Sequence, residues 1–261
     1  MPAISHDGIE IYYELHGSGP PLLLIAGLAS DSQSWLPVLP GLAERYQVIV
    51  LDNRCVGRST QECETSIALM AEDCRLLLDH LGLEGVPVAG HSMGGMVALE
   101  LALRYPRLVG KLALIASTAC NPVRNNLMFG DWADWYEDSD KRPAWLRMVL
   151  AWVLTPEFFD NLRMLEYAIN YQLDYPWPQS AAAFRRQVHA IAAYDVTDRL
   201  PLISMPTFVL AAGRDILLPP PCSQQLASRI PGAQLMVLED AAHSIHSEYA
   251  EEFVRLLSSV M

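Results

Sequence analysis

A serine between two glycines is the side chain best placed to do chemistry in this sequence. Residues 90–94 read Gly-His-Ser-Met-Gly, the Gly-x-Ser-x-Gly pattern, with a strand-like apolar run at 86–89 and a helical pattern to about Tyr105. Such a turn lifts a serine hydroxyl clear of the sheet and faces it with the helix N-terminus. We predict that Ser92 is a nucleophile, against the alternative of a glycine-rich turn with an incidental serine. The two glycines are expected because side chains there would collide where strand and helix cross.

A serine hydroxyl is a poor nucleophile near neutral pH, so it needs a base and a group that orients the base. Among seven histidines, only His243 and His246 follow a late strand-like run. His243 comes five residues after Leu238, which ends that run, and we predict that it is the base, with His246 as the alternative. His91 neighbours Ser92, but its side chain should point the other way and be structural or line a pocket.

The orienting group should be an acid that directly follows a strand. Asp215 follows the apolar run 207–211 through Ala-Gly-Arg and is the predicted third member. The rivals are Asp195 and Asp198, which precede that strand and so lie at its wrong end, and Asp240, which we expect to be exposed.

The oxyanion formed by serine attack needs hydrogen-bond donors aimed at it beforehand. One should be the backbone N–H of Met93, directly after the nucleophile. The other should come from the loop after the apolar run 22–25, most simply the N–H of Leu28.

Alternating strand and helix patterns must position these residues. The strand-like runs are 9–15, 22–25, 48–51, 86–89, 112–116, 207–211 and 235–238, and helical patterns cover about 66–81, 92–105 and 222–230. Continuous apolar runs are typical of strands buried on both faces of a parallel sheet. We therefore expect a mostly parallel α/β sheet with helices on both faces and a site at the carboxyl ends of the strands.

The pattern changes between 121 and 195. No buried-strand run appears there, and this stretch holds five of the six tryptophans. We expect a helical cap at 121–195 inserted into a core formed by 1–120 and 196–261. Trp132, Trp135 and Tyr136 are candidate substrate-binding residues because helical spacing would place them on one face, although plain cap packing gives the same pattern.

These motifs together resemble the α/β-hydrolase superfamily over nearly the whole chain. The matching pieces are Gly-His-Ser-Met-Gly-Gly at 90–95, Asp-Asn-Arg-Cys-Val-Gly-Arg-Ser at 52–59, Gly-Arg-Asp at 213–215 and Ala-His at 242–243. The chain order Ser92, Asp215, His243 is the one expected for this superfamily. The resemblance implies an eight-stranded sheet and serine hydrolase activity. Segments including 25–28 and 184–187 are weakly similar to the enol-lactonase and aminoacrylate-hydrolase group.

Two positions depart from the superfamily pattern. Ala26 stands where histidine is usual, and Cys55 stands where glycine is usual. Both leave the predicted triad complete. They alter the expected shape of the loop after the run 22–25, which should carry an oxyanion donor, and they leave a cysteine near the pocket as an alternative. We expect Cys55 to be a small buried side chain.

Composition narrows the class of protein. The chain has 261 residues, a net charge of −12 and 51% hydrophobic residues, so it can bury a large core and lacks the basic surface that nucleic acids require. The five cysteines are scattered without C-x-x-C spacing, which favours reduced thiols in the cytoplasm. Neither a signal peptide nor an apolar run of about 18 residues is found, so we expect no membrane partner.

The sequence therefore favours a cofactor-independent, metal-free serine hydrolase that cleaves a small carboxylic ester or lactone through an acyl-enzyme. The partner is expected to be a small-molecule substrate, with the protein a monomer or homodimer. One alternative keeps the same triad but cleaves a C–C or C–N bond. The others are a non-catalytic receptor on this scaffold and an interfacial lipase whose cap meets lipid.

Overall fold

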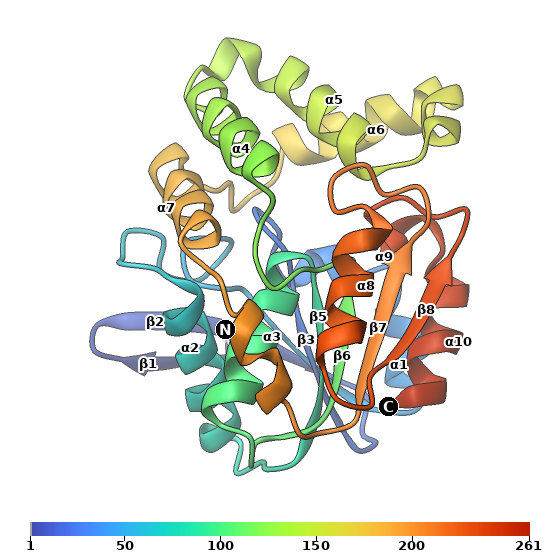
Figure 1. Cartoon of the computed structure of the whole chain (residues 1–261). Helices are drawn as coiled ribbons and strands as arrows, with labels where there is room; N and C mark the ends of the chain where they lie inside the picture. The colour runs from blue at the N-terminus through green and yellow to red at the C-terminus, as the bar shows by residue number, and fades with distance from the viewer. Residues whose placement is uncertain (1) are drawn as a thin grey trace.

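The computed structural model describes residues 2–261 and has an eight-stranded sheet at its centre (Figure 1). The strand order is β1-β2-β4-β3-β5-β6-β7-β8, with antiparallel pairing in β1-β2 and β2-β4 and parallel pairing elsewhere. The strands are β1 (Ala3–His6), β2 (Ile9–His16), β3 (Pro21–Ile25), β4 (Gln47–Leu51), β5 (Val86–His91), β6 (Val109–Ile115), β7 (Thr207–Ala212) and β8 (Gln234–Leu238). The predicted mostly parallel eight-stranded α/β sheet is confirmed.

Each central strand feeds two apolar cores because successive side chains point to opposite faces. On β3, Leu23 and Ile25 pack into one core, and Leu22 and Leu24 pack into the other. β1 has no counterpart in the predicted runs, since it is short and joins β2 through a tight turn. Asp7 and Gly8 in that turn both have positive φ, 47° and 78°, as a two-residue hairpin turn requires.

Helices cover both faces of the sheet, as Figure 1 shows. Side chains of α2, α3 and α8 share the core with Leu23, and those of α1 and α10 share the core with Leu22. The core helices are α1 (Leu39–Ala43), α2 (Ile67–His80), α3 (Met93–Arg104), α8 (Pro220–Arg229), α9 (Ile245–Glu248) and α10 (Ala250–Val260), and a 3-10 turn, η1, spans Ser32–Trp35.

The segment between β6 and β7 is helical and lies over the carboxyl ends of the strands (Figure 1). We call it the cap. It holds α4 (Val123–Tyr136), α5 (Arg142–Val153), α6 (Leu162–Leu173) and α7 (Ala181–Ala192), with 3-10 turns η2 (Ser139–Lys141) and η3 (Pro156–Asp160), and a further turn, η4 (Thr197–Leu202), leads back to the sheet. An antiparallel bridge between Cys120 and Asp195 closes its base.

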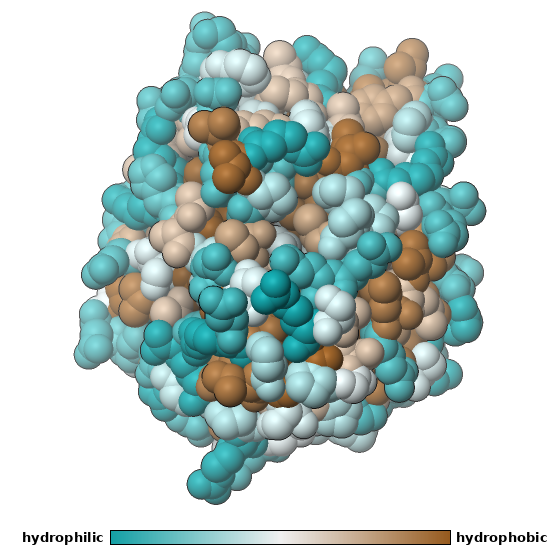
Figure 2. Space-filling model, in the orientation of Figure 1, coloured by the Kyte–Doolittle hydropathy of each residue, from teal (hydrophilic) through white to brown (hydrophobic). Residues whose placement is uncertain are grey.

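The cap has its own apolar interior. The ring of Trp145 lies 4.7 Å from that of Tyr136 and 5.7 Å from that of Phe184, measured between centroids. The face of the molecule seen in Figure 2 is mixed, with apolar side chains scattered among hydrophilic ones. Such scattered exposure is ordinary for a folded chain. Within residues 2–261, no helix is long and apolar enough to cross a membrane.

The crossing of β3 and α3 leaves no room for a side chain at Gly94. A Cβ atom there would lie 2.0 Å from the carbonyl oxygen of Ile25, whereas one at Gly130, in α4, would meet nothing within 4 Å. We expect Gly94→Ala to lower the free energy of unfolding by about 1–3 kcal/mol through overpacking. Gly130→Ala should raise it by up to about 1 kcal/mol, because alanine favours the helix. Urea unfolding of both variants checks this, and equal stabilities would contradict the packing argument.

Candidate active site

Ser92 occupies a strained turn between β5 and α3. Its φ of 54° and ψ of −119° lie outside the regions that side chains favour. Three hydrogen bonds hold this conformation. The N–H of Ser92 donates to the carbonyl of Ile115 at 2.9 Å, and the carbonyl of Ser92 accepts from the N–H of Gly95 at 2.9 Å and from Ser117 Oγ at 2.7 Å. The turn therefore has the geometry of the predicted nucleophile elbow.

Close packing explains the glycines on either side of this turn. A Cβ atom at Gly90 would lie 2.2 Å from the carbonyl oxygen of Gly94, and one at Gly95 would lie 2.3 Å from Ser117 Oγ. The contact at Gly90 is the expected collision of strand and helix, whereas glycine at position 95 makes room for the side chain of Ser117.

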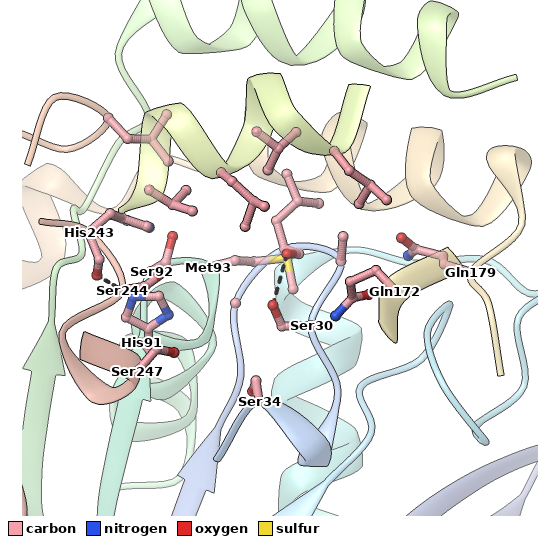
Figure 3. A pocket seen from close by; sticks show the side chains of 18 of the residues that line it. Ser30, Ser34, His91, Ser92, Met93, Gln172, Gln179, His243, Ser244 and Ser247 are labelled. Atoms are coloured by element: carbon pink, nitrogen blue, oxygen red, sulfur yellow. Dashed lines mark hydrogen bonds between the residues drawn. The ribbon is translucent and has the colours of Figure 1, made fainter. Parts of the chain in front are cut away.

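His243 and Asp215 are joined by a buried hydrogen bond. His243 Nδ1 lies 2.7 Å from Asp215 Oδ2, and the other carboxylate oxygen accepts the N–H groups of Leu217 and Leu218, each at 2.8 Å. A carboxylate fixed in this way favours a proton on Nδ1, which leaves Nε2 free to accept one. Figure 3 shows His243 and Ser92 close together at one side of a cavity.

The alternative base and two of the alternative acids make other contacts or are exposed to solvent. His246 is buried against Trp35, with ring centroids 4.7 Å apart, and burial lowers its pKa to about 3. Asp240 is exposed, and Asp195 accepts the N–H of Thr197 at the base of the cap. The structure brings together the preferred pair, His243 and Asp215.

His91 supports the backbone of His243. Its Nε2 lies 2.9 Å from the carbonyl oxygen of His243, so Nε2–H is the donor. Burial, together with the neighbouring His246 and His243, holds the pKa of His91 well below its ordinary value, and the ring is therefore neutral. This position fits the expected structural role.

The loop after β3 lies directly against the elbow. A Cβ atom at Gly27 would stand 3.3 Å from the Cβ of Ser92. In the described part of the chain, neither the N–H of Leu28 nor that of Met93 has an acceptor. These are the two donors predicted for the oxyanion, and both belong to segments that meet at Ser92.

The first three carbonyl groups of this loop each accept a hydrogen bond. The carbonyl of Ala26 accepts from Asn53 Nδ2 at 3.2 Å, that of Gly27 from the N–H of Ser30 at 3.3 Å, and that of Leu28 from Ser30 Oγ at 3.3 Å. The side chain of Ala26 is a methyl group and makes no hydrogen bond, so the loop is held by its neighbours. We call residues 26–30 the oxyanion loop.

A cavity of about 730 Å³ lies between the cap and the sheet. Ser92, Met93 and His243 line it on the sheet side. Its apolar lining from the cap includes Trp132, Tyr136, Trp145, Leu146, Val149 and Phe184. The side chains from α5 were missed by the sequence reasoning, because a helical pattern alone does not show which face of a cap helix turns toward the sheet.

Trp135 does not line this cavity, unlike Trp132 and Tyr136. Its side chain is 49% exposed. On a helix of 3.6 residues per turn, Tyr136 lies about 40° to one side of Trp132 and Trp135 about 60° to the other. That difference is enough to turn Trp135 toward solvent.

The loop that carries His243 is also tied to the cap. The carboxylate of Glu248 accepts the N–H of Thr155 at 3.0 Å and its hydroxyl at 2.6 Å, and the N–H of Ser244 donates to the carbonyl of Val153 at 2.9 Å. The cap therefore shares hydrogen bonds with residues 239–244, which we call the histidine loop, and with α9 directly after it.

Within residues 2–261, no cluster of three or more His, Cys, Asp or Glu side chains could hold a metal ion.

Comparison with known proteins extends these observations. A family model described as the alpha/beta hydrolase fold matches residues 20–249. A protein of Azorhizobium caulinodans, provisionally named carbamate hydrolase RutD, is 31% identical over 267 residues, which cover 98% of this chain and 97% of that protein.

Solved structures with the same fold include an enol-lactonase and an enzyme described as degrading lactones. The enol-lactonase from Burkholderia xenovorans LB400 has a TM-score of 0.88 at 23% identity, covering 99% of both chains. Est816, described as an N-acyl homoserine lactone degrading enzyme, has a TM-score of 0.85 at 27% identity, covering 100% of both chains.

The buried His246 should make stability depend on pH. Its pKa is about 3 in the folded protein, against an ordinary value of 6.5, so the unfolded chain binds a proton in a range where the native protein does not. The contribution to the free energy of unfolding that comes from keeping His246 neutral is fully present above about pH 6.5. It is lost as the pH falls toward 3. Below pH 6 the free energy of unfolding should therefore fall less steeply in His246→Phe than in the wild type, by about 1.4 kcal/mol per pH unit.

Urea unfolding at pH 7, 6 and 5 measures this slope. The matched control is His189→Gln, since His189 is exposed on α7. An unchanged slope in His246→Phe would contradict the neutral, buried state of this ring.

Proposed function

The chain belongs to the alpha/beta hydrolase fold family, and from that premise we propose that it is a cofactor-independent serine hydrolase of carboxylic esters or lactones. Ser92, His243 and Asp215 are the proposed catalytic residues. The observation that carries the proposal is the buried hydrogen bond between His243 and Asp215, because it orients a histidine beside the cavity that Ser92 also lines.

In the proposed first step, Ser92 Oγ attacks the substrate carbonyl carbon while His243 Nε2 takes the hydroxyl proton. The carbonyl oxygen becomes an oxyanion that accepts hydrogen bonds from the N–H groups of Leu28 and Met93. Collapse of this intermediate breaks the C–O bond, and the proton on His243 goes to the leaving alcohol. An ester of Ser92 with the acyl group remains.

In the second step, a water molecule attacks that ester as His243 takes one of its protons. A second oxyanion forms and collapses, the acid leaves, and the proton returns to Ser92 Oγ. The carboxylate of Asp215 stabilises the imidazolium of His243. Loss of one oxyanion donor typically costs about 3–4 kcal/mol of transition-state stabilisation.

The cavity favours a substrate with an apolar group next to the cleaved bond. Its volume of about 730 Å³ is in the range of small-molecule sites, and its roof is formed by rings and aliphatic side chains, with Trp132 and Tyr136 as proposed substrate contacts. The lactone-degrading activity named for Est816 agrees with this class.

A carbamate is the second candidate substrate. It is supported by the name of the relative that is 31% identical over nearly the whole chain. The same attack on a carbamate carbonyl would release an amine through a C–N bond or an alcohol through a C–O bond. An apolar N- or O-substituent would suit the cavity better than unsubstituted carbamate.

A substrate panel tests the reaction class. We expect the protein to hydrolyse apolar esters or lactones, and the release of acid measures this reaction. Matched N-alkyl carbamates in the same panel allow the kcat/KM values of the two substrate classes to be compared. Ser92→Ala should lower kcat by a factor on the order of 10⁶ on every substrate that is cleaved. Near-normal turnover by this variant, or a wild-type protein that fails to react with a fluorophosphonate, would rule out the serine mechanism.

Asp215→Asn tests the role of the carboxylate. The amide keeps the shape of the side chain but no longer favours the required tautomer of His243, so kcat should fall by about 10⁴. Circular dichroism should show an unchanged fold. A loss of less than tenfold would assign the orientation of His243 to other contacts.

A further inference from the structure

A glutamine of the cap contacts the oxyanion loop in the interior of the protein. Gln187, on α7, has no exposed surface. Its Oε1 accepts the N–H of Ala29 at 3.1 Å, and its Nε2 donates to the carbonyl of Arg54 at 3.0 Å. One carboxamide thus joins the cap to two core loops, next to the proposed oxyanion donor Leu28.

The orientation of this carboxamide is determined by its partners. The N–H of Ala29 needs an acceptor and the carbonyl of Arg54 needs a donor, so a flipped amide would leave both unpaired. Gln179 adds a third contact, since its Nε2 donates to Gln187 Oε1 at 3.0 Å and to the carbonyl of Cys55 at 2.6 Å. Buried polar groups left unpaired are costly, so the Gln187 carboxamide has one favoured orientation, whereas Gln179 Oε1 is buried without a partner.

The network acts on a strained part of the oxyanion loop. Ala29 has a φ of 56°, in the region that favours glycine, and such a conformation persists only where surrounding contacts hold it. The N–H of Ala29 and the carbonyl of Leu28 belong to one peptide plane. The N–H of Ala29 donates to Gln187, and the carbonyl of Leu28 accepts a hydrogen bond from Ser30 Oγ.

The adjoining peptide plane contains the proposed oxyanion donor. Its carbonyl, that of Gly27, accepts the N–H of Ser30. Because a trans peptide is planar, its N–H, that of Leu28, must point the opposite way. The direction of the Leu28 N–H therefore depends on the turn that Gln187 and Ser30 maintain together.

We propose that Gln187 is a positioning residue that holds the oxyanion loop so that the Leu28 N–H is aimed at the oxyanion. The inference rests on the proposed function, since it assigns a role within that reaction. It makes the cap part of the catalytic apparatus, because the side chain that sets the loop comes from α7.

The test variant is Gln187→Met, which keeps the length of the side chain and removes the acceptor. We expect kcat on a cleaved ester to fall tenfold to a hundredfold with KM changed less than twofold, because the misplaced donor matters in the transition state. An alkyl boronic acid, which forms a tetrahedral adduct with a nucleophilic serine, should lose affinity by a similar factor. A purely structural role would not move these two quantities in parallel.

Two further variants separate positioning from general docking of the cap. Arg186→Met removes a tie between the same helix and the core, the pair with Glu62 at 2.9 Å, and should leave kcat and boronate affinity unchanged. Gln187→Glu keeps an acceptor for the N–H of Ala29, and as a neutral buried acid it also keeps a donor for the carbonyl of Arg54. It should therefore recover at least half of the lost activity, measured on a logarithmic scale. Thermal melts identify which variants are folded. If Gln187→Met does not fold, the kcat of Gln187→Glu tests the proposal in its place.

Several outcomes would overturn the proposal. These are an unchanged kcat in Gln187→Met, a loss confined to KM, an unchanged boronate affinity, or an equal loss in Arg186→Met. A Gln187→Glu variant that is no more active than Gln187→Met would also overturn it. If Gln187→Met does not fold, a folded Gln187→Glu variant with less than a tenth of the wild-type kcat would overturn it. Failure of the serine mechanism is recognised separately, because Ser92→Ala would then retain turnover.

Discussion

The close crossing of β5, α3 and β3 at Ser92 is the constraint on which the rest of the site depends. The serine adopts an unfavourable backbone conformation, and it does so because glycines let the helix and strands approach to backbone contact. The turn is then held by a hydrogen bond that Ser92 donates to Ile115 of β6 and by one that it accepts from Ser117. The same approach brings the oxyanion loop against Ser92, so the proposed nucleophile and the proposed oxyanion donors are positioned by one packing arrangement.

The second organising feature is the number of hydrogen bonds that cross from the cap to the core loops. Gln187 reaches the oxyanion loop, Thr155 reaches Glu248 beside the histidine loop, and Tyr175 donates to Asp31. The cap therefore does more than roof the cavity with apolar side chains. Its polar side chains contact the loops that carry the proposed catalytic groups.

Much of the core could be predicted from the sequence because its signals are local. Buried parallel strands read as continuous apolar runs, and Asp215 and His243 each follow such a run. Strand β1 was missed because four residues in an edge hairpin carry little periodicity. Trp135 was grouped with Trp132 and Tyr136 because helical spacing alone does not show where the edge of a buried face lies.

The sequence by itself determined the α/β sheet, the elbow at Ser92 and the order of the candidate catalytic residues, since each depends on residue types within a short stretch. Only the tertiary structure decided that His243 rather than His246 meets Asp215, which cap side chains line the cavity and which groups hold the oxyanion loop. Gln187 lies 158 residues from Ala29 along the chain. No local pattern reports such a contact, because it depends on how the cap folds back onto the sheet.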